Sequence, residues 1–254
     1  MLKRVPFIAL ALAASMAALW YYALKNPTDT SNHVLVVGTN AEYYPFSFIR
    51  DGAFTGFDID LVETLAQRLN KKISIKDMSF DALIPEAQLG SIDIIAAGLT
   101  PTEQRAQRIL FTKPYITSDP LMIITNAKNS SINGVADLKG KSVVVNEGFT
   151  ADFYASKLPE IQLTRLATTT ESFLSLQSGR SDAFISAKSA VKPFFEKYST
   201  NEYKIIPIEG TSDSYALALS KKAADLLPVV QAELDAMEAD GTLAQLKKKW
   251  GFAV

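Results

Sequence analysis

One structural unit occurs twice in the chain, and it limits the folds that the sequence can form. In residues 82–98 and again in residues 172–188, an amphipathic stretch ends at a glycine, an aspartate follows three residues later, and an apolar segment comes next. Glycine is the usual residue just after a helix, and strands that alternate with helices indicate a parallel sheet covered on both faces. One interpretation is that any two helix–turn–strand units look alike. The other, which we adopt, is that the chain is an α/β protein with two similar lobes.

The hydrophobic pattern elsewhere is also that of alternating strands and helices. We expect strands at 34–38, 73–75, 92–97, 142–145 and 183–186, and helices at 57–69, 81–89, 171–177, 190–198 and 223–239. Two other extended segments, 115–124 and 211–219, are expected to cross between the lobes as a two-stranded hinge. We therefore predict a first lobe of residues 34–118 and 214–254 and a second lobe of residues 119–213.

This arrangement predicts where a ligand binds. Open parallel sheets bind ligands beyond the carboxyl ends of their strands. Two such lobes that face each other would form a cleft lined by residues 97–100 and 186–188.

The first 25 residues have the features of an export signal or a membrane anchor. Lys3 and Arg4 precede residues 5–24, which carry no charge, and a polar linker is expected at 26–33. The segment fits a cleaved signal peptide, and it is also long enough to be kept as an anchor that tethers the protein to the inner membrane. Both interpretations place the rest of the chain outside the cytoplasm, in the periplasm or its equivalent.

Composition excludes several classes of function. The formal net charge is −1, so no basic excess is available to bind a nucleic acid. The chain has no cysteine, and His33 is its single histidine. Disulfides, thiolate metal sites and a serine–histidine nucleophile are therefore excluded, and we expect no metal and no cofactor. Residues 134–142 resemble a phosphate-binding loop, but the glycine spacing and the strand expected after them do not fit one.

Arg105 is the most informative single residue. Thr100, Pro101 and Glu103 predict a helix that begins at Thr100, with the threonine as N-cap and Glu103 completing a capping box. Arg105 gains nothing from such a position, because a helix N-terminus disfavours cations. Its guanidinium is suited to bind a carboxylate at the end of a strand; an ion pair with Glu103 or a neighbour remains the alternative.

Two aromatic clusters also follow expected strands, at residues 38–46 and 78–80. Such residues are most often part of the core, but a pair on a cleft wall can hold a ligand side chain between its rings.

Taken together, the motifs resemble those of the extracytoplasmic amino-acid-binding proteins of ABC importers, the polar and basic amino-acid type. The resemblance covers residues 34–252 and rests on residues 37–48, 56–69, 79–105, 111–115, 137–150, 178–183 and 240–251. It implies a periplasmic-binding-protein-like fold of type II, in which two α/β lobes close on one amino acid.

The resemblance also implies roles for individual residues. Arg105 is expected to pair with the α-carboxylate of the ligand, with help from the Gly98 backbone and the hydroxyl groups of Thr100 and Thr150. Further side chains are expected around the ligand side chain: Tyr43 and Phe80 beside it, Asn40 at its polar end, and Glu147 near a cationic ligand unless this is only a solvated loop acid.

One position departs from the family pattern. Similar proteins usually carry an aspartate for the α-ammonium group where this chain has Ala187, followed by Lys188. Either Glu147 substitutes, or the ligand is not an ordinary α-amino acid, or binding is weak. Asn40 also stands where binders of basic amino acids often carry an aspartate, which weakens the case for arginine or lysine without excluding it.

The function implied by the resemblance is that of a receptor and not of an enzyme. We expect a monomer that binds a polar amino acid, with basic ones such as arginine among the candidates, and delivers it to an ABC transporter permease. Two alternatives stay open: an enzyme similar to cyclohexadienyl or arogenate dehydratases with Glu147 as general acid, and a tethered surface module that has lost ligand binding.

Overall fold

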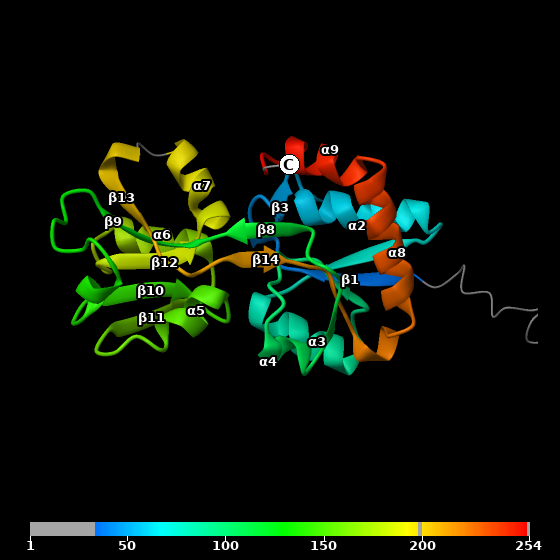
Figure 1. Cartoon of the computed structure of the whole chain (residues 1–254), viewed down its shortest axis with the longest axis horizontal. Coiled ribbons are helices and arrows are strands. Elements are labelled where there is room, and N and C mark those ends of the chain that lie inside the picture. Colours follow the sequence, from blue (N-terminus) through cyan, green and yellow to red (C-terminus); the bar gives the residue numbers. More distant parts are fainter. Residues whose placement is uncertain (1–33, 198–199, 253–254) are drawn as a thin grey trace, which may run out of the picture.

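The computed structural model describes residues 34–197 and 200–252, which form two α/β lobes joined by a two-stranded ribbon (Figure 1). The leader or anchor predicted for residues 1–25, its tether at 5–24, the linker at 26–33 and His33 lie outside the described residues. No helix in the two described ranges is both long and apolar enough to span a bilayer. In the same ranges, no three acidic or histidine side chains are grouped to hold a metal ion.

The first lobe is built on a five-stranded sheet with the order β5-β1-β6-β15-β7. The central pairs of β1 with β5 and β6 are parallel, whereas β15 runs antiparallel between β6 and β7. The strands are β1 (Leu35–Thr39), β5 (Ile73–Asp77), β6 (Ile94–Ile95), β7 (Leu110–Phe111) and β15 (Ala218–Leu219). The helices are α2 (Phe57–Arg68), α3 (Leu83–Leu89), α4 (Glu103–Ala106), α8 (Leu226–Ala239) and α9 (Thr242–Lys249), with short 3₁₀ turns at Phe80–Ala82 and Lys221–Ala223.

Alternation along β1 explains how this sheet is covered on both faces. Leu35 and Val37 belong to the core that includes α2, α8 and α9. Val36 faces the other way, into the cluster formed by α3. Figure 1 accordingly shows α2 and α9 on one side of β1 and α3 on the other. Side chains of a strand alternate between the faces of its sheet, so β1 is apolar throughout because both faces are buried.

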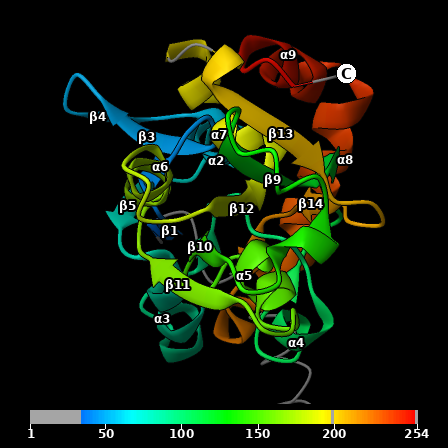
Figure 2. The ribbon, with the colours of Figure 1, turned by 90° about the vertical axis from the view of Figure 1, so that its left-hand side faces the viewer.

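The second lobe repeats the same pattern of pairing with the order β11-β10-β12-β9-β13. Here β10 is parallel to β11 and β12, and β9 runs antiparallel between β12 and β13. The strands are β9 (Leu121–Asn126), β10 (Ser142–Asn146), β11 (Gln162–Leu166), β12 (Ala183–Ala187) and β13 (Tyr203–Pro207). The helices are α5 (Thr150–Ala155), α6 (Thr169–Gln177) and α7 (Lys188–Lys197), with 3₁₀ turns at Val135–Leu138 and Thr200–Glu202. Figure 2 shows α5 on one face of this sheet and α6 and α7 on the other.

The repeated glycine and aspartate have the same structural roles in both lobes. Gly90 and Gly179 follow α3 and α6 with φ angles of 79° and 74°, which is the left-handed region that glycine enters without strain. Asp93 Oδ2 accepts a hydrogen bond of 2.9 Å from the backbone N–H of Val36, and Asp182 Oδ2 accepts one of 2.9 Å from that of Ser142. Each aspartate thus fastens the beginning of the strand that is parallel to both of its neighbours, and the prediction of two similar α/β lobes is confirmed.

The two connecting segments form the hinge. The strands β8 (Ile116–Asp119) and β14 (Asp213–Tyr215) are antiparallel and lie side by side between the lobes (Figure 1). The Tyr215 hydroxyl donates to Asp119 Oδ2 at 2.6 Å, and the Ser189 hydroxyl donates to the same oxygen at 2.5 Å. The hinge is therefore tied to α7 as well as to its own partner strand.

A small sheet in the first lobe lies outside the strands predicted from the sequence. It consists of β2 (Glu42–Tyr43), β3 (Ser47–Arg50) and β4 (Ala53–Thr55). Asp51 and Gly52 form the turn between β3 and β4 with φ angles of 53° and 78°, the conformation that favours Asp-Gly in a two-residue hairpin. Phe48 of this hairpin packs edge-on against Trp250 at a ring distance of 5.8 Å.

Asp58 is a buried carboxyl group in the first lobe, and its burial makes the stability of the fold depend on pH. Tyr115 donates to Asp58 Oδ1 at 2.6 Å, and the Gly98 backbone N–H donates to Oδ2 at 2.5 Å. Burial raises the pKa of Asp58 to about 7, although both hydrogen bonds lower it in part. A carboxyl whose folded pKa lies above its unfolded value of about 4 stabilises the fold most in its protonated form.

We therefore expect the free energy of unfolding to fall as the pH rises from about 4 to about 7. Asp58 should contribute a slope of up to about 1.4 kcal/mol per pH unit in that window. Urea denaturation at several pH values should show a flatter profile for Asp58→Asn than for the wild-type protein. Asp51→Asn, at an exposed turn, should leave the profile unchanged; equal slopes for wild type and Asp58→Asn would contradict the assignment.

Candidate functional site

A small cavity lies where the two lobes meet the hinge. The first lobe, the second lobe and the hinge all contribute to its wall, and the space between the side chains is about 10 Å³, room for about one water molecule. The lining residues are Tyr43, Phe80, Gly98, Thr100, Arg105, Asn146, Phe149, Thr150, Ala151, Ser186, Ala187, Asp213 and Tyr215. Six of the eight residues predicted for the binding site are among them: Tyr43, Phe80, Gly98, Thr100, Arg105 and Thr150.

Arg105 connects the two lobes across this cavity. Its Nη1 donates to the Thr100 carbonyl of the first lobe at 2.8 Å, and its Nη2 donates to the Gly148 carbonyl of the second lobe at 2.9 Å. The residue is only 5% exposed, and its guanidinium lies 5.5 Å from the centre of the Phe80 ring and 5.7 Å from that of Phe153. Burial lowers the pKa of Arg105 to about 10, so the group keeps its charge at neutral pH in a largely apolar place.

The helix that carries Arg105 begins two residues later than the sequence predicted. Its N-cap is Thr102, whose hydroxyl accepts a hydrogen bond of 3.2 Å from the Arg105 backbone N–H. The prediction of Thr100 as N-cap is therefore wrong. Thr102 has the extended backbone of a cap residue, so the Thr100 hydroxyl is not used as a cap and acts on Asp213.

Asp213 places a second charged group in the cavity. It lies on β14, is 7% exposed, and accepts a hydrogen bond of 2.5 Å from the Thr150 hydroxyl. Burial raises the pKa of Asp213 to about 6, with a smaller upward effect from Asp119. The hydroxyl bonds from Thr150 and Thr100 and the charge of Arg105 act in the opposite direction. A carboxylate and a guanidinium thus share one nearly dry site.

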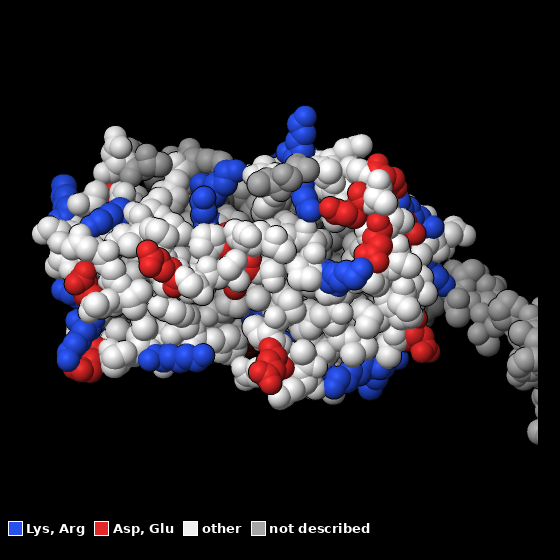
Figure 3. All heavy atoms as spheres, in the orientation of Figure 1, with Lys and Arg blue, Asp and Glu red and all other residues white. Residues whose placement is uncertain are grey.

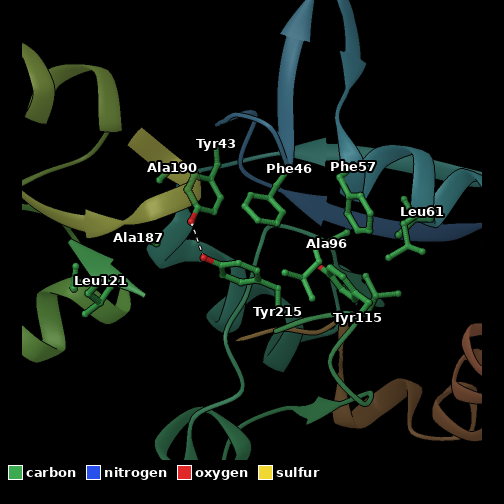
Figure 4. Close-up of a cluster of buried hydrophobic side chains, with 14 of the residues drawn as sticks. Tyr43, Phe46, Phe57, Leu61, Ala96, Tyr115, Leu121, Ala187, Ala190 and Tyr215 are labelled. Carbon is green, nitrogen blue, oxygen red and sulfur yellow. Dashed lines mark hydrogen bonds between the residues drawn. The ribbon is translucent and has the colours of Figure 1, made fainter. Parts of the chain in front are cut away.

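Aromatic rings fill most of the remaining space. Phe80 of the first lobe stacks on Phe149 of the second at a centroid distance of 4.1 Å. Tyr43 meets Phe149 edge-on at 5.2 Å and stacks on Phe46 at 5.0 Å. Figure 4 shows the Tyr43 hydroxyl pointing at that of Tyr215, and the two oxygens are 3.4 Å apart. The two lobes therefore meet through stacked rings beside the charged pair.

Gly98 is required by the packing of Tyr43. Its φ angle is 57°, and a Cβ at this position would lie 2.5 Å from Tyr43 Cε1. The Gly98 N–H donates to the buried Asp58 carboxyl. Gly98 therefore lines the cavity, while its N–H donates its hydrogen bond within the first lobe, to Asp58.

The two other predicted residues lie outside the lining. Asn40 is 8% exposed, and its Nδ2 donates to the Met78 carbonyl at 3.1 Å. Glu147 is exposed on the turn after β10. Ala187, the position that departs from the family pattern, does line the cavity and is 6% exposed.

The sequence interpretation missed five residues of the wall: Asn146, Phe149, Ala151, Asp213 and Tyr215. A signal was present for each. Asn146 directly follows the strand expected at 142–145, and Phe149 and Ala151 flank the predicted Thr150. The other two lie in the segment 211–219 that was expected to cross between the lobes. Residues at a hinge touch both lobes, so a charged side chain there is a candidate for the ligand site.

A larger hollow of about 980 Å³ runs along β8 between α7 and α9. It contains none of the residues predicted to bind a ligand, and its charged groups have both signs; Lys113, for example, pairs with Asp235 at 3.0 Å. On the face shown in Figure 3, the charged side chains are likewise scattered in small groups of both signs.

Comparisons with known proteins agree with the two-lobed fold. Residues 35–253 match the family described as bacterial extracellular solute-binding proteins, family 3. The arginine-binding extracellular protein ArtP of Bacillus subtilis (strain 168) is 28% identical, covering 88% of each chain. The L-arginine-binding protein of Pseudomonas aeruginosa is 29% identical, covering 93% of this chain and 95% of its own.

Solved structures show the same two-lobed fold. An ancestral arginine-binding protein bound to arginine is 33% identical with a TM-score of 0.81, covering 85% of this chain and 97% of its own. An ancestral amino-acid-binding protein described as a precursor of cyclohexadienyl dehydratase is also 33% identical, with a TM-score of 0.77 and coverage of 85% and 95%. The match over residues 35–253 and the shared fold establish that the chain belongs to family 3 of the bacterial extracellular solute-binding proteins.

Proposed function

We propose that the protein is an extracytoplasmic receptor that binds a polar amino acid, with arginine as the leading candidate, and delivers it to an ABC transporter permease. The observation that carries the proposal is Arg105, a buried cation that faces both lobes in a cavity at the hinge. The planar guanidinium of Arg105 is suited to bind the α-carboxylate of the ligand. This carboxylate would replace the two backbone carbonyls, which are weaker partners for the guanidinium. Relatives whose names give arginine as the ligand support the same assignment.

Binding of this kind needs no covalent chemistry. A ligand that contacts both lobes favours the closed arrangement by the contacts it adds there, and the hinge of β8 and β14 allows the lobes to move. Because the cavity is about 10 Å³, an amino acid enters only if the lobes separate or Phe149 moves out of its stack on Phe80.

We retain the other parts of the sequence interpretation as proposals. The lobes are taken as residues 34–118 with 214–254 and residues 119–213, the protein as a monomer, and the periplasm or its equivalent as its location. The enzyme alternative rests on Glu147 as general acid, and the exposure of Glu147 outside the cavity lining gives it no support.

Removal of Arg105 tests the assigned carboxylate site. In a thermal-shift panel of the twenty amino acids, we expect one or a few polar ones, arginine first, to raise the Tm of the wild-type protein. A ligand at 100 times its Kd adds about 2.7 kcal/mol. Arg105→Ala should abolish the shift because the carboxylate loses its cation. Arg108→Ala, which removes an exposed arginine on the next turn, should keep it.

The same panel separates the alternatives. A shift that survives Arg105→Ala would contradict the assigned carboxylate site. A flat panel together with turnover of prephenate or arogenate would favour an enzyme, and a flat panel without turnover would favour a surface module.

Phe149 allows a separate test, because its stack on Phe80 competes with a ligand for the same space. A stacked pair is worth about 0.5–1.5 kcal/mol beyond its buried area, so Phe149→Thr should tighten the Kd for arginine by up to about tenfold in isothermal titration calorimetry. Phe48→Ala, which removes a ring that does not line the cavity, serves as the control and should leave the Kd unchanged. A weaker Kd for Phe149→Thr would mean that the ring contacts the ligand instead of excluding it.

A further inference from the structure

We propose that Asp213, on the second hinge strand, binds the α-ammonium group of the amino acid and thereby does what Ala187 cannot do. This inference rests on the proposed function, since it assigns a residue to part of the same ligand. An α-amino acid carries an ammonium group beside its carboxylate, and a buried ammonium needs an anionic partner. Asp213 is the one carboxylate among the described residues that line the cavity.

The surroundings of Asp213 fit this role. Thr150 of the second lobe donates a hydroxyl hydrogen bond to its carboxylate, and Thr100 of the first lobe acts on the same group. A carboxylate offers about four acceptor positions, so the bond from Thr150 holds the group in place and leaves positions for an ammonium. Asp213 also interacts electrostatically with Arg105, which puts a cation and an anion in the same cavity, as the two ends of a zwitterion require.

Ala187 and Asp213 are complementary in this cavity. Ala187 ends β12 with a methyl group that accepts no hydrogen bond, and it is 6% exposed. A carboxylate at both positions would bury two like charges in one small space, which is unfavourable. The alanine therefore suits a site in which the anion comes from the hinge.

The location of the anion also joins recognition to hinge motion. Asp213 is the register partner of Asp119 on β8, and the charge of Asp119 acts on Asp213. A bound ammonium would offset this repulsion between the two strands. An amino acid would then stabilise the hinge ribbon itself in addition to the contacts between the lobes.

The test compares pairs of ligands that differ only in the α-ammonium group: L-arginine with 5-guanidinopentanoate, and L-glutamine with glutaramate. Losing one partner of a buried charge pair costs at least about 2 kcal/mol, which is about 30-fold in Kd. For the wild-type protein we expect calorimetry to give a Kd at least about 30-fold lower for the amino acid of a pair than for its analogue. Asp213→Asn should weaken binding of the amino acid by a similar factor and change binding of the analogue little.

Asp225→Asn is the control, because it removes an exposed carboxylate that does not line the cavity. It should keep the preference for the amino acid. The ligand comparison on the wild-type protein needs no variant, so it decides the question even if Asp213→Asn does not fold.

Two results would overturn the assignment of Asp213 alone. One is a wild-type protein that binds each analogue as tightly as its amino acid. The other is an Asp213→Asn variant in which amino acid and analogue weaken equally, as a merely structural role would predict. A wild-type protein that binds neither amino acid would instead overturn the proposed function, and this inference with it.

Discussion

The arrangement of the two lobes depends on one buried cation. Arg105 reaches from the first lobe to the Gly148 carbonyl of the second, where little water screens its charge. Around it lie the groups that compensate for its burial: two carbonyls, two aromatic faces and the hinge carboxylate Asp213. The stacked rings of Phe80 and Phe149 then close the remaining space. Residues from both lobes and the hinge therefore act on a single charge.

Local patterns in the sequence predicted much of this fold. Apolar strands, amphipathic helices and the repeated glycine and aspartate each act within a few residues or within one lobe, and the two-lobed α/β class is confirmed. Six of the predicted site residues line the cavity because they follow the ends of strands, where any ligand of such a sheet must lie. The hairpin turn at Asp51 and Gly52 was also readable from the sequence and was missed.

Other features depend on which distant segments meet. Thr102 and not Thr100 caps α4 because two threonines compete for one helix start, and only the geometry decides between them. Phe149 and Asp213 enter the cavity because the second lobe and the hinge close against the first. The residues that neighbour Phe149 and Asp213 in the chain do not specify which distant residues these two will contact. Asp213, for example, accepts its hydrogen bond from Thr150, which lies more than sixty residues away in the sequence.

The place of β15 in the first sheet has a consequence for the order in which the lobes can be completed. The strands β9 to β13 of the second lobe come from one uninterrupted stretch, residues 121–207, whereas β15 at Ala218–Leu219 separates β6 from β7 in the first lobe. A chain growing from its N-terminus thus contains every strand of the second sheet before it can finish the first. Until residue 219 is available, β6 keeps an open edge, and the first lobe becomes complete only after the chain has returned through the hinge.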